Sequence, residues 1–241
     1  MSSQITISYS QEISLNIKST YKPKQTTLFS LINHKLNELK YTSENHIPTD
    51  GFIIFCEEVF TLLEEFKLPS LSTYVFALVK NDFFNNLNKI RDTYSKDSKK
   101  NNTLQSMIQN EIREKKNKDK NSATNALLWA TRSILYLREF LYQHGIKNND
   151  DLVECAHIAY KNSLKRHHNW LLVNFFYYAI KLVSVNKNDV IAKFAYEQED
   201  FFSNPQQFES QIKEELKITI KSMDDLIDSI RLFCMFKNLD L

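Results

Sequence analysis

Glycine and proline are scarce in this chain, with 2 and 4 copies among 241 residues. Domains built from many short strands need both residues at their turns, so a turn-rich β sandwich is excluded. Hydrophobic residues make up 42% of the chain, and its length suits one domain with a full core. The composition therefore predicts a single all-α domain.

Cysteine is rare as well, and the three copies, Cys56, Cys155 and Cys234, lie far apart in apolar segments. No two of them have the close spacing of zinc ligands or of a redox pair. We expect three reduced thiols in the core.

Neither sign of charge is in large excess, because 31 basic and 29 acidic residues leave a net charge of +2. Nucleic acid is therefore not expected as a partner. Residues 1–4 lack the pattern of a signal peptide and the glycine of a myristoylation signal. The most apolar stretch, 170–185, is interrupted by Asn174 and Lys181 and is shorter than the ~20 residues that span a bilayer. We expect a cytoplasmic protein that meets membranes only from outside.

Sequence signatures of enzymes and metal sites are missing. The two glycines, Gly51 and Gly145, cannot form a phosphate-binding loop, and no nucleophile elbow occurs. The histidines at 157, 167 and 168 do not have the spacing of metal ligands. We therefore expect no enzymatic activity, no cofactor and no metal.

Apolar residues recur at helical spacing after residue 26. The expected helices cover 27–41, a segment after Pro48, 71–94, 103–113, 123–144 and 150–185, with a last helix or helix pair that opens at Pro205. Gly145 is expected to end the 123–144 helix as its C′ residue. Residues 1–26 form an extension, read as a stray strand or a loose tail, and residues 27–241 form the domain. The lysine-rich run 115–120 is typical of a solvated loop.

Polar groups follow apolar ones along one face of the 71–94 helix. Asp82, Asn86 and Lys89 lie at i, i+4 and i+7, on the face that also carries Phe76 and Val79. This stripe is either a binding site or the polar end of an ordinary amphipathic helix.

Trp129 and Arg132 lie one turn apart in the apolar 123–144 segment. The indole could be a ligand platform or a core residue, and Asp82 is a candidate partner for the guanidinium. His168 shares a helical face with apolar residues, as a satisfied core histidine or a binding residue would. That face also carries Leu164, Leu172, Phe175, Phe176 and Ala179.

Trp170 lies about 200° from His168 around the same expected helix. Its face mixes aromatic and basic groups, Lys181 among them, as membrane-contacting surfaces do. The alternative is that this face packs under a neighbouring helix.

Four segments, taken in order, resemble the glycolipid transfer protein family. They are 79–82 with Asn86 and Lys89, 103–105, 126–129 with Arg132, and 159–170, which ends in His168-Asn169-Trp170. The match runs from about residue 27 to residue 241. It implies a two-layer helical sandwich with a hydrophobic pocket for one sphingolipid. The implied function is transfer or sensing of glycosphingolipids, without catalysis, by a monomer.

The resemblance also implies roles for individual residues. Asp82 would accept from the ceramide N–H, and His168 would donate to the ceramide carbonyl. Asn86 and Lys89 would bind sugar hydroxyls, the Trp129 indole would stack under the first sugar ring, and Arg132 would support the aspartate.

The acyl chains need an enclosed pocket, because ~30 exposed methylenes at ~0.8 kcal/mol each would cost roughly 24 kcal/mol. Matched position and helical face together give its expected lining: Phe76, Val79, Leu164, Phe176 and Ala179. Trp170 and Lys181 are the expected membrane contacts.

The head-group class follows from two positions. The ceramide-1-phosphate branch of the family places basic residues where this chain has Trp129 and Ser133, so the sugar-binding branch fits better. Two alternatives remain, ceramide-1-phosphate transfer and a helical interaction scaffold without lipid. Phe201 and Phe202 follow an acidic stretch and resemble an endoplasmic-reticulum tethering motif, although phenylalanines near a helix end usually pack.

Overall fold

The computed structural model describes residues 27–65, 73–181 and 205–241, and within these ranges it describes the side chains outside 61–65, 73–79 and 205–207. The regular structure there is helical, apart from an isolated bridge between Pro48 and Thr103. This confirms the predicted all-α class. None of the described helices has the length and hydrophobicity needed to cross a bilayer.

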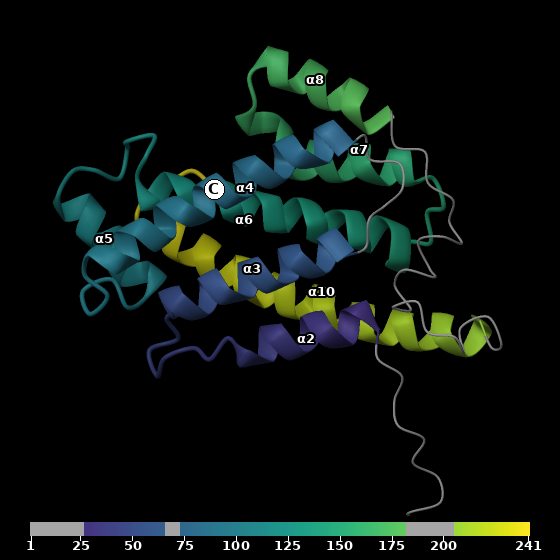
Figure 1. Cartoon of the computed structure of the whole chain (residues 1–241), viewed down its shortest axis with the longest axis horizontal. Coiled ribbons are helices and arrows are strands. Elements are labelled where there is room, and N and C mark those ends of the chain that lie inside the picture. Colours follow the sequence, from purple (N-terminus) through teal and green to yellow (C-terminus); the bar gives the residue numbers. More distant parts are fainter. Residues whose placement is uncertain (1–26, 66–72, 182–204) are drawn as a thin grey trace, which may run out of the picture.

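The helices surround α6, which contacts α4, α5, α7 and α10, while α2 lies against α10 and α3 (Figure 1). α8 lies beside α7 at one edge. In chain order the elements are α2 (Leu28–Glu38), α3 (Thr49–Glu65), α4 (Thr73–Lys96), α5 (Leu104–Arg113), α6 (Ala123–Leu141), the π turn η1 (Tyr142–Ile146), α7 (Leu152–Ser163), the 3-10 turn η2 (Lys165–His167), α8 (Trp170–Lys181) and α10 (Pro205–Phe236).

Local sequence explains where several helices begin. Thr27 and Thr103 each form a capping box with the serine three residues later, so α2 and α5 start directly after them. Buried Glu111 accepts from the backbone N–H groups of Ala123 and Thr124, which satisfies the first turn of α6. Pro205 is the first residue of α10, as predicted.

The three cysteines are free and buried, as predicted. Cys56 and Cys234 belong to the main core cluster, which joins α2, α3, α4, α5, α6 and α10. Burial raises the pKa of the Cys155 and Cys234 thiols to about 11. At neutral pH all three therefore act as small apolar side chains.

Two expected helix boundaries were wrong. The 150–185 segment is not one helix, because α7 ends at Ser163 and Asn169 starts α8 by accepting from the Leu172 N–H at 3.0 Å. Gly145 is not a left-handed C′ residue but lies inside η1, with a negative φ. A Cβ there would lie 2.0 Å from Cδ2 of Leu216, so glycine allows α10 to approach this turn.

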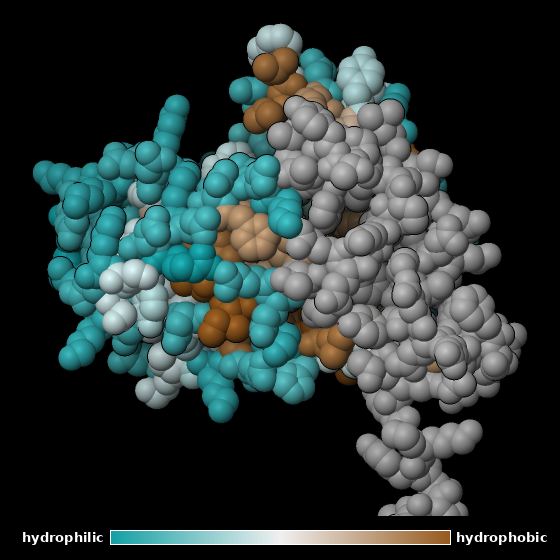
Figure 2. Space-filling model, viewed as in Figure 1, coloured by the Kyte–Doolittle hydropathy of each residue, from teal (hydrophilic) through white to brown (hydrophobic). Residues whose placement is uncertain are grey.

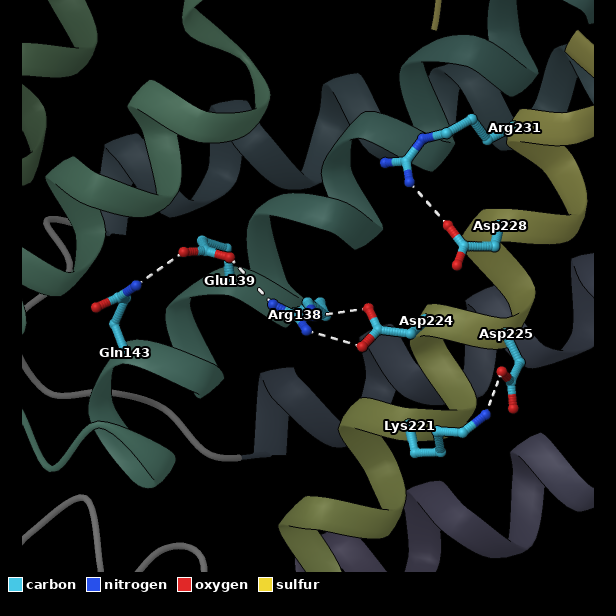
Figure 3. A network of polar contacts seen from close by, with 8 residues as sticks. All are labelled: Arg138, Glu139, Gln143, Lys221, Asp224, Asp225, Asp228 and Arg231. Atoms are coloured by element: carbon cyan, nitrogen blue, oxygen red, sulfur yellow. Dashed lines mark hydrogen bonds and ion pairs between the residues drawn. The ribbon is translucent and has the colours of Figure 1, made fainter. Parts of the chain in front are cut away.

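The far end of α6 is fixed to α10 by a fully partnered arginine (Figure 3). Nε and Nη2 of Arg138 donate to the two carboxylate oxygens of Asp224, each at 2.7 Å. Nη1 donates to Glu139 at 3.1 Å, and the guanidinium carbon lies 4.9 Å from the ring centroid of Tyr142. Such a bidentate pair sets the register of the two helices.

Candidate functional site

The polar stripe of α4 is organised by a hydrogen-bonded amide. Asn86 is buried, and its Nδ2 donates to the backbone carbonyl of Asp82 at 3.0 Å and to its Oδ2 at 3.4 Å. One turn later, Nζ of Lys89 donates to the Lys120 carbonyl at 3.2 Å, so the lysine-rich loop borders the stripe. The Asp82 carboxylate is held in place but open to solvent, with acceptor capacity left for a ligand.

Trp129 on α6 is half-buried among cationic and aromatic groups. The guanidinium of Arg132 lies 4.8 Å from its ring centroid, and the imidazole of His168 stacks on it at 5.4 Å and 26°. The ring of His167 meets it edge-on at 6.3 Å. Trp129 is therefore part of a cluster that joins α6 to the α7–α8 connection.

His168 lies in the extended connection between η2 and α8, not on a helix as predicted. Its ring contacts Phe176 on α8, and its Nδ1 lies 3.0 Å from the hydroxyl of Tyr160 on α7. Tyr160 is itself buried and stacked on Phe176 at 5.0 Å. Two helices thus hold the imidazole, although no helical spacing relates them.

Asp82 and His168 come from distant segments and influence one another. Burial raises the pKa of Asp82, while Lys89 and His168 oppose that shift. Burial lowers the pKa of His168, with Asp82 opposing and Arg132 adding to the change. The lowered pKa of His168 favours an uncharged imidazole at neutral pH, and the carboxyl group of Asp82 is close enough to interact with it electrostatically.

The hydrogen-bond partner that the structure shows for Arg132 differs from the expected Asp82. The hydrogen bond of Arg132 runs from Nη2 to the backbone carbonyl of Asp240, at 2.6 Å. The residues after α10 fold back onto α6, so this carbonyl takes the place expected for Asp82. Asn86 supports the aspartate instead.

The apolar residues expected in the pocket have mixed outcomes. Leu164 and Ala179 are buried, and Phe176 packs against the cluster of Tyr160, Leu164 and Ile180. Phe76 and Val79 lie on α4, but their side chains are outside the described set. The pocket itself stays a prediction.

α8 presents a broad apolar surface. Trp170 is 75% exposed, and Lys181 is exposed at the other end of the helix with Nζ 4.2 Å from the ring centroid of Tyr177. Hydrophobic side chains appear at the top of Figure 2, where α8 lies in Figure 1. The exposed apolar residues of this helix are Trp170, Leu171, Leu172, Tyr177 and Tyr178.

Sequence reasoning missed three residues at this site: Tyr160, His167 and Asp240. Tyr160 was noted only as part of a motif, and its contact with His168 depends on the break between α7 and α8. Asp240 reaches Arg132 over 108 positions of sequence, which no local pattern encodes. Residues 1–26 and the Phe201-Phe202 pair lie outside the described residues.

The chain is similar to proteins of known class. In zebrafish, pleckstrin homology domain-containing family A member 8 is 28% identical over 84% of this chain and 35% of its own length. A glycolipid transfer protein of Aureobasidium melanogenum is 24% identical over 89% of this chain and 96% of its own. The chain thus spans about a third of the length of the pleckstrin homology relatives.

Solved structures share the fold. The structure that explains how FAPP2 selects simple glycosphingolipids with the GLTP fold has a TM-score of 0.77 at 24% identity, covering 90% of this chain and 98% of its own. Mouse ceramide-1-phosphate transfer protein has a TM-score of 0.72 at 18% identity, covering 90% and 100%. Fold similarity therefore does not decide the head group. The model of the glycolipid transfer protein (GLTP) family matches residues 47–196, so this chain belongs to that family.

Proposed function

We propose that this domain binds one glycosphingolipid and moves it between membranes without catalysis. The observation that carries the proposal is the meeting of Asp82, His168 and Trp129. The carboxylate can accept from the ceramide N–H, the imidazole can donate to the ceramide carbonyl, and the indole offers a flat surface to a sugar ring. These are the three groups that a ceramide amide and its first sugar require.

Tyr160 supports the donor role of His168. When its hydroxyl donates to Nδ1 over the 3.0 Å contact, the neutral imidazole carries its proton on Nε2. The lowered pKa keeps the ring neutral, so Nε2 presents one donor outward. Asn86 and Lys89 lie one and two turns from Asp82, where they could reach sugar hydroxyls.

The sugar class follows from Trp129 and Ser133. The Ser133 hydroxyl donates to the Trp129 carbonyl at 3.1 Å, within α6, and neither side chain carries the positive charge that a phosphate needs. Ceramide-1-phosphate transfer is therefore the alternative that the test must address.

Membrane contact fits the exposed face of α8. Trp170 can enter the interface while Lys181 meets lipid phosphates, as amphipathic membrane-contacting helices do. We infer a peripheral protein that works as a monomer on cytosol-facing membranes. Tethering to the endoplasmic reticulum through Phe201 and Phe202 stays a prediction.

The test is transfer of fluorescent lipids between vesicles, with glucosylceramide, galactosylceramide and ceramide-1-phosphate side by side. We expect the wild type to prefer the two sugar lipids, and Trp129→Ala to slow their transfer about tenfold, since stacking on an aromatic ring is worth ~1 kcal/mol or more. Tyr142→Ala is the matched control, because that ring also lies against an arginine of α6, Arg138, at 4.9 Å, but is not part of the cluster around His168. Faster transfer of ceramide-1-phosphate by the wild type would overturn the sugar assignment. Folded protein that transfers none of the three would favour the scaffold reading.

A further inference from the structure

The end of α10 turns sharply and fixes the residues that follow. Asn238 has a φ of 53°, its N–H donates to the Met235 carbonyl at 3.1 Å, and the N–H of Leu239 donates to the Cys234 carbonyl at 2.9 Å. This pair of bonds is a Schellman motif, in which asparagine tolerates the left-handed position. The turn sends residues 239–241, which we name the strap, back over α6.

The strap contacts two guanidinium groups, that of buried Arg132, which lies beside Trp129, and that of exposed Arg166. The Asp240 carbonyl accepts from Nη2 of Arg132 at 2.6 Å, and the Leu241 carbonyl accepts from Nη2 of Arg166. Leu239 and Leu241 pack against the main core cluster, which holds both carbonyls in position.

Arg132 is incompletely satisfied by this arrangement. Its side chain belongs to a residue only 6% exposed, and its buried Nε has no hydrogen-bond partner among the described residues. The bond it does make is to a neutral carbonyl, and the nearby Asp240 carboxylate is 87% exposed. Buried guanidinium donors are normally matched by oxyanions, which can accept from two of them at once.

His167 holds the guanidinium of Arg166 by a hydrogen bond. Nε of Arg166 donates to Nε2 of His167 at 2.8 Å, and the imidazole is held neutral by a pKa lowered to about 4. Burial causes most of that shift, and Arg132 and Arg166 add to it. Arg132 stacks on Trp129, and Arg166 bonds to His167, whose ring also meets Trp129, so the two guanidinium groups lie near enough for Arg166 to lower the pKa of Arg132.

We propose that Arg132 and Arg166 form a subsite for a tetrahedral oxyanion on a lipid head group, and that the strap oxygens occupy its donors and so favour neutral head groups. The proposal deepens the proposed function and rests on it, because Trp129 marks the head-group position. The oxyanion would replace the two strap carbonyls and could also accept from the free Nε of Arg132. A phosphate monoester and a sulfated sugar both supply this chemistry.

The first test loosens the strap with Leu239→Ser and Leu241→Ser together, and Ile218→Ser, at an exposed position on α10, is the control. Transfer of ceramide-1-phosphate and of sulfated galactosylceramide is measured against neutral galactosylceramide. We expect the ratio to rise at least tenfold for one or both anionic lipids, and the lipid that gains identifies the source. Adding Arg166→Gln should remove the gain. An unchanged ratio, or a gain that survives Arg166→Gln, overturns the proposal.

The second test does not depend on transfer. The chain has 2 tryptophans, so Trp170→Phe leaves Trp129 as the sole reporter of indole fluorescence. Titration with inorganic phosphate and sulfate should give a saturable change in Trp129 fluorescence when Leu239→Ser and Leu241→Ser are added to Trp170→Phe. Trp170→Phe alone, with the strap intact, should bind the two anions at least tenfold more weakly. Equal binding by both, or binding by neither, overturns the proposal.

The two tests separate this proposal from the proposed function. Saturable phosphate binding without transfer of any lipid would support the subsite and refute the carrier role. If the double serine variant does not fold by circular dichroism, Asn238→Val replaces it, since a β-branched residue disfavours a φ of 53° and weakens the turn without altering the core.

Discussion

Arg132 and Arg138 lie on the same helix, less than two turns apart, and differ in almost every contact. Both stack on an aromatic ring, at 4.8 and 4.9 Å. Arg138 binds both oxygens of Asp224, and its pKa is raised by its carboxylate partners against the effect of burial. Within the described part of the chain, Arg132 donates to one neutral carbonyl and its Nε has no acceptor, and burial lowers its pKa.

The difference separates a structural end of α6 from a binding end. Paired charges with satisfied donors fix two helices against each other (Figure 3). A buried group with unused hydrogen-bond donors, such as Arg132, has no such structural benefit. It lies in the cluster that contains His168 and Trp129. Substitutions at the binding end should therefore affect transfer more than stability, and those at the other end should do the reverse.

The largest expected effect is at the binding end. Asp82→Val and His168→Leu should each slow lipid transfer about 10- to 100-fold, because each leaves one ceramide polar group unpaired at ~1–3 kcal/mol. Asp224→Val is the matched control for the aspartate. Vesicle transfer assays measure the effect, and circular dichroism verifies folding. Undiminished transfer by the folded variants would remove both residues from the site.

Lowering the pH should destabilise the fold through His167, whose ring meets Trp129 at the binding end of α6. His167 has a pKa lowered to about 4 in the folded chain, against 6.5 in an unfolded one, so the unfolded state binds the proton more tightly. The free energy of unfolding should therefore fall as the pH drops from about 6.5 to 4, by on the order of 1 kcal/mol from this residue once solvent screening of a partly exposed group is included. The lowered pKa of His168 acts in the same direction, and the raised pKa of Asp82 acts against it.

Urea unfolding of the wild type and His167→Gln at pH 7 and pH 4.5 measures the contribution. The variant should lose much of the pH dependence, whereas His34→Gln, at an exposed position on α2, should not. Equal pH dependence in the wild type and His167→Gln would contradict the assignment.

The smallest effect belongs to the structural end. Asp224→Asn should lower the free energy of unfolding by ~1 kcal/mol, since the pair with Arg138 is bidentate but partly open to solvent. This corresponds to a Tm roughly 2–4 °C lower for a chain of this size, measured by thermal unfolding. Transfer by the folded variant should match the wild type. A transfer defect without loss of stability would show that the two ends of α6 are not separate.

Sequence by itself determined the helical class, most helix starts and the state of the cysteines. These depend on local signals: scarce glycine and proline, capping residues such as Thr103, and apolar spacing. Helical spacing also placed Asp82 and Asn86 on one face, because residues one turn apart on a helix share a face whatever the rest of the fold does, whereas their binding roles and that of Trp129 came from the family resemblance.

Only the tertiary structure decided how the segments meet. The break at Asn169 places His168 against Tyr160, and the turn at Asn238 brings Asp240 to Arg132. Both contacts depend on chain reversals whose direction is set by packing against α6, so the sequence offered Asp82, and not Asp240, as the candidate partner of Arg132. Sequence periodicity fixes which residues share a face, but the partner of that face is chosen by packing between residues distant in the chain.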